Sequence, residues 1–280
     1  MGDEGLSGTC AVVTGGAGVI GSALVKALAA AGSSVAIVDL NGDLAQQRAS
    51  EITQATGGTV IGVAANVLDK NSLVTAKNEI NMRFGSVDFL VNGAGGNAPK
   101  ATTIAEFIEE ADIAQPDRTF FGLDFEGFEK VFDLNFAGTV LPTQVFAEEM
   151  LRRGTGAILN ISSMNSFRPL TRIPAYSAAK ASINNFTAWL AVHFAPRNVR
   201  VNAIAPGFLC TSQNRFLLYD EATGELSDRG KKIIAATPMR RFGEPEELCG
   251  PALFLLSDAA RFVTGTVMPV DGGFNVYSGV

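Results

Sequence analysis

The 280-residue sequence predicts an α/β fold, a single-domain doubly wound parallel sheet with helices on both faces. Three observations predict this fold. Short apolar segments alternate with amphipathic helical segments, several apolar segments end in glycine, and no repeat or linker divides residues 1–280. Apolar runs of this kind are typical of strands buried on both faces of a parallel sheet, and right-handed crossovers then place helices on both sides.

Six strand candidates can be recognised in chain order. They are CAVVTG (10–15), SVAIVDL (34–40), TVIGVAAN (59–66), DFLVNGAG (88–95), GAILNISS (156–163) and RVNAIAPG (200–207). Helical patterns follow at 21–32 and 44–56, and another begins near residue 173. Residues 96–126 break this alternation with a long stretch of mixed charge, rich in acids and phenylalanine. Loops of that length are usually functional or disordered, so we interpret this extended loop as a cover over an active site.

The composition restricts the possible classes of function. With 47% hydrophobic residues and a net charge of −6, the chain is typical of a globular protein and does not resemble a nucleic-acid binder. Three scattered cysteines and a single histidine argue against a disulfide framework and against a metal site. We find no signal-peptide pattern at the start and no apolar run of membrane-spanning length. We therefore expect a cytoplasmic protein with no membrane partner.

A glycine-rich segment, VVTGGAGVIGSALVKAL (12–28), joins the first strand candidate to the first helix. Its glycines, at 15, 16, 18 and 21, allow a tight turn and close approach to a pyrophosphate at the helix N-terminus. Close strand–helix packing would explain the same glycines. Asp39 ends the second strand, where a carboxylate accepts hydrogen bonds from the adenosine ribose and repels a 2′-phosphate. Since Leu40 and Asn41 follow in place of an arginine, we expect NAD rather than NADP.

Tyr176 precedes Lys180 by about one helical turn in IPAYSAAK (173–180), so both side chains are expected on one helix face about 6 Å apart. A free phenol has a pKa of about 10, and a neighbouring cation lowers it. Tyr176 is therefore our candidate general acid/base, with Lys180 as the cation that tunes it. We interpret the small residues around the pair as room for a cofactor. The alternative is an exposed Tyr–Lys pair that only supports the helix.

Several motifs together resemble the short-chain dehydrogenase/reductase family along nearly the whole chain. They are TGGAGVIG (14–21), VNGAG (91–95), DLNFAG (133–138), NISS (160–163), YSAAK (176–180), VNAIAPG (201–207) and PVDGG (269–273). Three positions depart from the family pattern: Val19 replaces a glycine, Gly93 an asparagine, and Asn66 an acid that contacts adenine. Residues 161–180 and the tail 270–280 are similar to the D-mannonate oxidoreductase (fructuronate reductase) subgroup.

The resemblance implies a Rossmann fold and roles for individual residues. Lys180 would also hold the nicotinamide ribose, Ser163 would orient the substrate oxygen, and Asn135 would support a water-linked proton path to the lysine. With Tyr176, these residues form the predicted catalytic set. The predicted cofactor-binding residues are Gly15, Gly18, Val19, Ile20, Asp39, Leu40, Asn66, Val67, Asn92, Ala94, Gly95, Tyr176, Lys180, Pro206, Gly207, Phe208 and Thr211.

A sugar acid needs a partner for its carboxylate, and arginine offers a bidentate fork. Arg168 and Arg172 lie between Ser163 and Tyr176, and Arg215 lies in the segment 208–235, which we expect to form a substrate lid. Any of these arginines could instead be a surface or subunit-contact residue. Substrate hydroxyls have Ser163 and four amide side chains as candidate partners, the amides being Asn97, Asn165, Gln213 and Asn214.

We expect an NAD-linked oxidoreductase that interconverts D-fructuronate and D-mannonate. Two alternatives stay open: a gluconate 5-dehydrogenase-like reaction or one on another polyol or keto-sugar, and a non-catalytic NAD-binding protein. The intact catalytic set argues against the second, because a sensor has no physical need for a tuned phenol. Members of this family are commonly tetramers, so the resemblance also implies a homotetramer.

Overall fold

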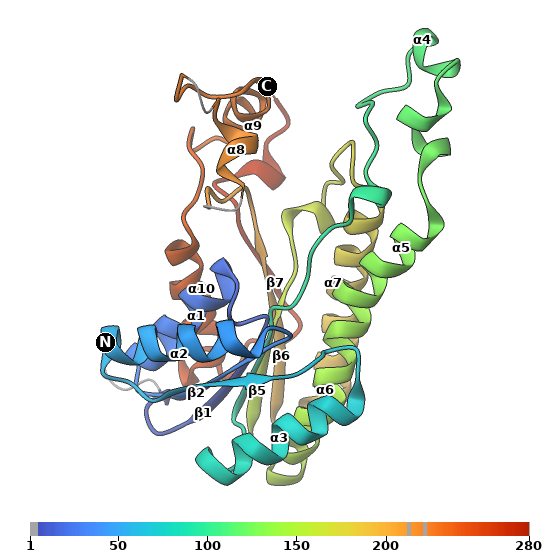
Figure 1. Cartoon of the computed structure of the whole chain (residues 1–280). Coiled ribbons are helices and arrows are strands. Elements are labelled where there is room, and N and C mark those ends of the chain that lie inside the picture. Colours follow the sequence, from blue (N-terminus) through green and yellow to red (C-terminus); the bar gives the residue numbers. More distant parts are fainter. Residues whose placement is uncertain (1–4, 212–213, 221–222, 280) are drawn as a thin grey trace.

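The computed structural model describes residues 5–211, 214–220 and 223–279 (Figure 1). Its seven strands form one parallel sheet in the order β3-β2-β1-β4-β5-β6-β7. The strands are β1 (Cys10–Thr14), β2 (Ser34–Asp39), β3 (Val60–Ala64), β4 (Phe89–Asn92), β5 (Gly156–Ile161), β6 (Val199–Pro206) and β7 (Val267–Val270). The predicted doubly wound fold is confirmed.

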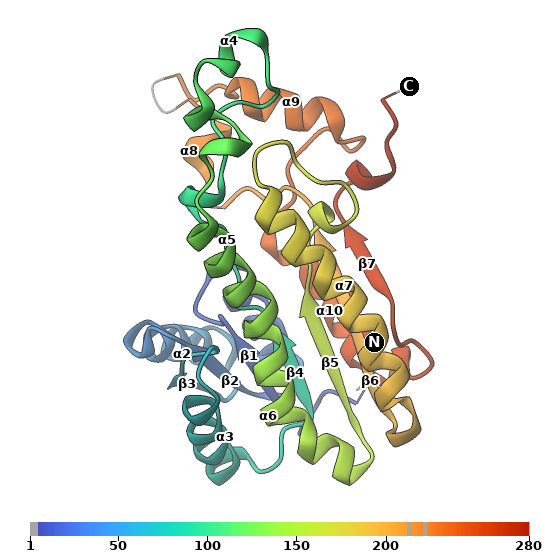
Figure 2. The same cartoon turned by 90° about the vertical axis from the view of Figure 1, so that its right-hand side faces the viewer.

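Helices cover both faces of the sheet, with α1, α2 and α10 on one face and α3, α6 and α7 on the other (Figures 1 and 2). Among the described residues, no helix is both long and apolar enough to span a membrane. The helices are α1 (Val19–Ala30), α2 (Gly42–Thr56), α3 (Lys70–Phe84), α4 (Glu110–Ile113), α5 (Phe125–Phe132), α6 (Gly138–Arg153), α7 (Pro174–Phe194), α8 (Arg215–Leu218), α9 (Asp228–Ala236) and α10 (Cys249–Leu256).

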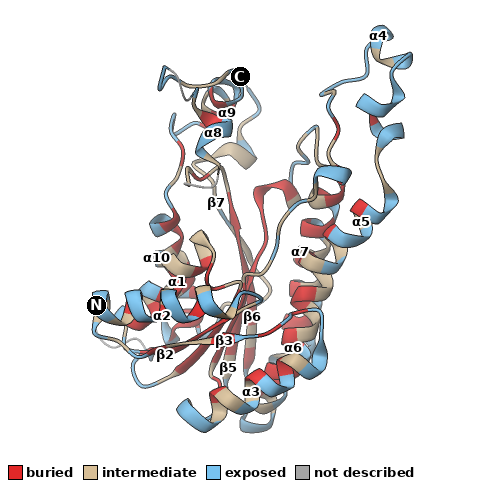
Figure 3. Cartoon of the chain, viewed as in Figure 1, coloured by how far each residue is buried: buried red, intermediate tan, exposed pale blue. Residues whose placement is uncertain are grey.

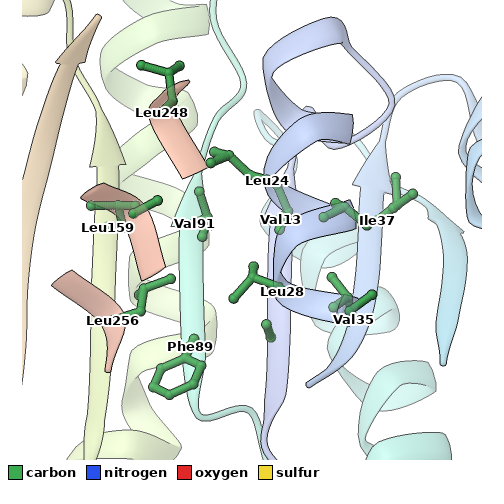
Figure 4. Packing of buried hydrophobic residues seen from close by; sticks show 14 of the residues in the cluster. Val13, Leu24, Leu28, Val35, Ile37, Phe89, Val91, Leu159, Leu248 and Leu256 are labelled. Atoms are coloured by element: carbon green, nitrogen blue, oxygen red, sulfur yellow. The ribbon is translucent and has the colours of Figure 1, made fainter. Parts of the chain in front are cut away.

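Two buried clusters hold the helices against the sheet, because successive side chains of a strand point to opposite faces. Val13 of β1 lies in one cluster with Leu24 of α1 (Figure 4). Val12, the preceding residue, lies in the other cluster with Leu73 of α3 and Phe146 of α6. The central strands are therefore buried on both sides (Figure 3), as their continuous apolar runs predict.

The seventh strand, β7, was not among the strand candidates. It has only four residues, VMPV, and it pairs with β6 at the edge of the sheet. Pro269 has no N–H group to donate, which is tolerated at an edge but weakens the strand signal in the sequence. The partner strand β6, rather than local propensity, explains why these residues are extended.

The strand order places a crevice at the carboxyl ends of the central strands. β1 pairs with β2 on one side and with β4 on the other, so the winding direction of the chain reverses between β1 and β4. Ligands of doubly wound sheets bind outside the carboxyl ends of the strands at such a reversal. The glycine turn after β1 and the VNGAG segment that ends β4 both lie there.

The segment from Gly96 to Asp124, which we call the arm, contains the short helix α4 and extends beyond the carboxyl end of the sheet (Figures 1 and 2). Several of its apolar side chains are largely exposed: Ile104, Phe107, Ile108, Ile113, Phe120 and Phe121. The arm contains no strand, in agreement with the predicted break in the alternation. Its role as a cover stays a prediction.

Candidate active site

A cleft of roughly 530 Å³ opens at the carboxyl ends of the central strands. Its lining includes most of the predicted cofactor and catalytic residues, namely Gly15, Gly18, Val19, Ile20, Asp39, Ala94, Gly95, Ser163, Tyr176, Lys180, Pro206, Gly207, Phe208 and Thr211. The lining residues that the sequence analysis did not name as site residues are Gly96, Ile161, Ser162 and Leu209, together with the glycines at 21 and 93. Gly21, Gly93, Ile161 and Ser162 lie within the motifs TGGAGVIG, VNGAG and NISS, whereas Gly96 and Leu209 have no side-chain chemistry that a sequence signal could distinguish.

A larger hollow of roughly 750 Å³ lies at the opposite end of the sheet, between Gly156 and Phe262. Arg200 lines it, but its guanidinium donates to the backbone carbonyl groups of Leu255 at 2.6 Å and Leu256 at 2.9 Å. Arg200 of β6 therefore holds the last residues of α10 against the sheet. The candidate active site is the cleft at the carboxyl ends.

The glycine turn packs too closely for side chains. Gly15 has a φ of +63°, and an added Cβ would lie 2.8 Å from the Cα of Ala94. A Cβ on Gly21 would clash with the Gly15 carbonyl oxygen and lie 2.7 Å from the Cα of Gly16. Close packing thus explains Gly15 and Gly21, and it holds the turn against the segment after β4.

The N-terminus of α1 fits an anionic group. Gly18 is its N-cap residue and supplies no side-chain hydrogen bond, and the first turn contains no acid. Its orphan N–H groups and the positive end of the helix dipole therefore face the cleft without competition from a side chain. These properties suit the pyrophosphate of a dinucleotide.

Asp39 connects the end of β2 to the glycine turn. Its carboxylate accepts hydrogen bonds from the Ala17 N–H at 3.2 Å and the Asn41 N–H at 3.1 Å. A shallow groove beside it is lined by residues 39–43 and Ala64, and it includes the second carboxylate of Asp43 but no cation. The negative charge of this groove suits ribose hydroxyls and disfavours a phosphate.

Tyr176 and Lys180 lie on one face in the first two turns of α7. The Lys180 Nζ atom is 5.6 Å from the centre of the Tyr176 ring, which confirms the expected separation. Lys180 is 4% exposed and donates to the Ile161 carbonyl oxygen at 2.8 Å, while burial lowers its pKa to about 8. An ammonium has three donors, so two are left for a ligand such as ribose hydroxyls.

The pKa of Tyr176 differs from the expectation. Burial raises the pKa of its phenol above the ordinary value, and only the neighbouring Ser163 hydroxyl acts in the opposite direction. The prediction that Lys180 lowers this pKa is therefore wrong for this structure, where desolvation of the phenolate is the largest influence and Lys180 is not among the groups that shift the pKa. The phenol holds its proton at neutral pH.

The small residues of α7 were predicted to make room for a cofactor, but in the structure they pack against neighbouring segments. Ala175 and Ala179 are fully buried in a cluster with Ala101 and Val131. They let α5 and the start of the arm approach α7 closely, and so they do not make room for a cofactor. The space beside Tyr176 comes instead from the glycines of the neighbouring strand ends.

Asn135 lies in a π-helical turn, Asp133–Ala137, between α5 and α6. Its buried amide donates to the carbonyl oxygens of Gly96 at 2.7 Å and Val131 at 2.8 Å, and accepts from the Gly96 N–H at 3.2 Å. A Cβ on Gly95 would lie 2.7 Å from the Asn135 Oδ1 atom and 3.2 Å from Lys180 Nζ. Asn135 therefore fixes the base of the arm and the cleft wall beside Lys180, and π-helical turns are frequent at functional sites.

Four of the predicted cofactor residues do not line the cleft. Leu40 lines the shallow groove next to Asp39, and Asn66 turns its side-chain oxygen to the Leu68 N–H at 2.9 Å. Val67 is buried. Asn92 is also interior, where it donates to Thr143 and Asn160 and joins β4 to β5 and α6. A motif places such residues near a strand end but does not show which face they take.

The predicted substrate residues separate into distinct surroundings. Arg168 donates to the Tyr277 carbonyl oxygen at 2.8 Å, and Arg215 stacks on the Tyr219 ring at 4.5 Å, so both are engaged outside the cleft lining. Arg172 and Asn97 line an adjacent hollow of roughly 390 Å³ between the arm and the segment that precedes α7. Gln213 lies outside the described residues.

Two amide side chains close to the cleft have different roles. Asn165 lies two residues after Ser163, and its N–H donates to the Ser163 Oγ atom at 3.2 Å. The buried side-chain oxygen of Asn165 has no hydrogen-bond partner within the described part of the chain. Asn214 lines the cleft but spends its amide on the backbone of Thr211 and Leu209. Asn165 is thus better suited than Asn214 to receive a ligand hydroxyl.

Metal chemistry has no visible site in the described ranges, where no group of three or more His, Cys, Asp or Glu side chains could hold an ion. All three cysteines are free.

Comparisons with known proteins agree with this geometry. A short-chain dehydrogenase family model described as enoyl-(acyl carrier protein) reductase matches residues 15–275. An uncharacterized oxidoreductase of Bacillus subtilis is 52% identical over 278 residues, which cover 99% of this chain and 98% of the relative.

Solved structures give the same family. A candidate D-mannonate oxidoreductase from Haemophilus influenzae with bound NAD is 50% identical, with a TM-score of 0.93 and 99% of each chain covered. A gluconate 5-dehydrogenase from Burkholderia cenocepacia in complex with NADP and tartrate is 29% identical, with a TM-score of 0.81 and 97% and 96% covered. The chain therefore belongs to the short-chain dehydrogenase/reductase family and is an NAD(P)-dependent oxidoreductase acting on CH–OH groups.

Proposed function

We propose that this protein is an NAD-dependent oxidoreductase of a sugar acid, interconverting D-fructuronate and D-mannonate. The observation that carries the proposal is one cleft that joins the glycine turn and Asp39 to Ser163, Tyr176 and Lys180. The substrate class is supported by the 50% identity to the Haemophilus influenzae candidate D-mannonate oxidoreductase and by the cationic Arg172 in the hollow beside the cleft.

The proposed mechanism uses the protonated phenol. When bound, the reduced nicotinamide supplies a hydride to the carbonyl carbon. Tyr176 gives its hydroxyl proton to the carbonyl oxygen, so that the ketone becomes an alcohol, and Ser163 donates a hydrogen bond that stabilises the developing negative charge. Lys180 offers two donors to the ribose of the cofactor, and Asn135 holds the Gly96 backbone in place beside them. The raised pKa of Tyr176 keeps the proton in place for reduction.

The proposed preference for NAD rests on charge. Asp39 and Asp43 line the groove that follows β2, and a 2′-phosphate there would meet two carboxylates without a balancing cation. We expect Asp39→Ala to reduce the preference for NADH over NADPH by about tenfold or more, as measured by the ratio of kcat/KM values. Unchanged discrimination between the two cofactors would contradict this role of Asp39.

The test of the function is a reduction assay with NADH on a panel of keto-uronates and neutral keto-sugars, with Tyr176→Phe as the variant. Removing the general acid should lower kcat by at least about 100-fold while NADH still binds, because the phenyl ring keeps the packing. Turnover of Tyr176→Phe close to the wild-type value would reject the mechanism. A wild-type enzyme that reduces none of the keto-uronates would reject the substrate class.

A second candidate function is a gluconate 5-dehydrogenase-like reaction. The similarity to the Burkholderia cenocepacia gluconate 5-dehydrogenase supports it. An oxidation assay with NAD on D-gluconate and D-mannonate separates the two, since this candidate requires oxidation of D-gluconate that exceeds oxidation of D-mannonate. The homotetramer, the cytoplasmic location, the cover formed by the arm and the lid at 208–235 stay predictions.

A further inference from the structure

Three segments that are far apart in the sequence meet at the end of the molecule where the carboxyl ends of the strands lie (Figure 2). Thr103 of the arm and Arg172, just before α7, are joined twice: the Thr103 N–H donates to the Arg172 carbonyl oxygen at 2.9 Å, and Arg172 Nε donates to the Thr103 carbonyl oxygen at 2.8 Å. Glu106 of the arm then forms an ion pair with Lys232 of α9 at 2.8 Å. Figure 2 shows the arm and α9 at the same end of the molecule.

Arg229 belongs to this junction, although the sequence analysis did not single it out. It precedes Lys232 by three residues on α9, so both side chains lie on one face of the helix. That face is directed at the arm, because Lys232 reaches Glu106. Arg229 and Arg172 therefore approach each other from opposite sides of the junction.

The electrostatics agree with this placement. Arg229 is exposed, and its pKa is lowered first by desolvation and then by the like charge of Arg172. Glu106 opposes this shift but is itself paired with Lys232. Within the ranges that the structure describes, neither Arg172 nor Arg229 forms an ion pair with a carboxylate.

We infer that Arg172 and Arg229 together form the site that receives the carboxylate of the substrate, with Arg229 contributed by α9. The inference rests on the proposed function and names the group that selects acidic substrates over neutral ones. Arg172 is four residues before Tyr176 in the sequence. The hollow that it lines begins at Asn97, the residue after Gly96 of the active-site cleft. Its Nε donor is used by Thr103, which orients the guanidinium and leaves its terminal nitrogens for a carboxylate.

Two features make the position of Arg229 unfavourable, and Glu106 offsets only part of their cost. Arg229 lies in the first turn of α9, where the helix dipole disfavours a cation, and it faces a second arginine. A bound carboxylate would relieve both repulsions and would accept charge-assisted hydrogen bonds from two guanidinium groups. Residues placed at an electrostatic cost beside an active site are candidates for function rather than for stability.

The experiment compares Arg229→Gln with the wild type in the reduction of D-fructuronate and in the binding of D-gluconate, a sugar acid without a carbonyl to reduce. We expect KM and the Kd for D-gluconate to rise by about 10- to 100-fold, with kcat changed by less than about threefold. Arg229→Lys should recover part of the loss because it restores the charge. Arg172→Gln should give a similar loss, and the double variant should lose less than the product of both.

Lys231→Gln is the matched control. It removes a cation from the same helix, but Lys231 is exposed and pairs with Asp228, so KM and Kd should not change. If the wild type reduces D-fructuronate and Arg229→Gln keeps the wild-type KM, the inference fails while the proposed function stands. If no keto-uronate is reduced but D-gluconate binds the wild type and not Arg229→Gln, the arginine site stands and the proposed reaction fails. Equal binding of D-gluconate to both proteins overturns the inference.

Discussion

The cleft wall around the glycine turn and the arm lie at the same end of the molecule but follow different rules. In the wall, Gly15 and Gly21 are enclosed by backbone atoms, so the identity of each residue is dictated by its neighbours. In the arm, Phe120 and Phe121 are 61% and 77% exposed, and their rings contact each other edge to face. Packing constrains each position of the cleft wall, so sequence motifs can be recognised there. The exposed positions of the arm carry no such constraint and no such motifs.

The largest combined effect on stability and cofactor binding is expected at Gly21, which is enclosed by the backbone of the glycine turn. In Gly21→Ala the new methyl group would meet the backbone of Gly15 and Gly16, and the turn would have to move away from α1. We expect a loss of about 1–3 kcal/mol in the free energy of unfolding and at least about tenfold weaker NADH binding. Urea unfolding and a fluorescence titration with NADH measure the two quantities.

Gly250→Ala is the control for that substitution. Gly250 lies exposed on α10, where an added methyl group meets no atom within 4 Å. Alanine should leave NADH binding unchanged and raise the free energy of unfolding by up to about 1 kcal/mol, because glycine is the weaker helix former. Equal losses in both variants would show that enclosure is not what distinguishes Gly21.

Lys180 should affect stability and activity in opposite directions. Burial lowers its pKa from 10.5 to about 8, so the folded protein pays roughly 3 kcal/mol to hold the ammonium at neutral pH. Lys180→Met removes that charge with a side chain of similar length, and we expect the free energy of unfolding to rise by about 1–3 kcal/mol while turnover is lost.

The pH dependence checks this explanation. As the pH rises through about 8 toward 10.5, folded Lys180 loses its proton while the unfolded chain still keeps it. Stability of the wild type then increases with pH, and its difference from Lys180→Met should narrow between neutral pH and about pH 9.5. Urea unfolding at both pH values measures this, with the exposed Lys231→Met as the control that should show no gain. A variant that is less stable at both pH values would contradict the account.

The smallest effect is expected in the arm. Phe121→Ala should change the free energy of unfolding by less than about 0.5 kcal/mol, because the ring is mostly exposed. Phe146→Ala, the same substitution at a fully buried ring, should cost about 3–5 kcal/mol. A cost for Phe121→Ala close to that of Phe146→Ala would mean that the arm is packed against another surface in solution.

Much of the fold and part of the site could be predicted because the relevant signals are local. The spacing of Tyr176 and Lys180 places them on one helix face, and the glycine turn followed by Asp39 indicates the nucleotide end. The same reasoning failed for Asn92, which a motif brings to the cleft and the structure buries behind it. Which face a side chain takes at a strand end depends on its neighbours in space.

The residues alone settled the order of the elements, the parallel sheet and the pairing of a phenol with an ammonium, because each follows from apolar periodicity or from spacing within one element. Tertiary packing decided that burial raises the pKa of Tyr176, that Ala175 and Ala179 seat α5 against α7, and that β7 completes the sheet. Desolvation and contacts between distant segments are properties of the assembled chain. No stretch of sequence contains them.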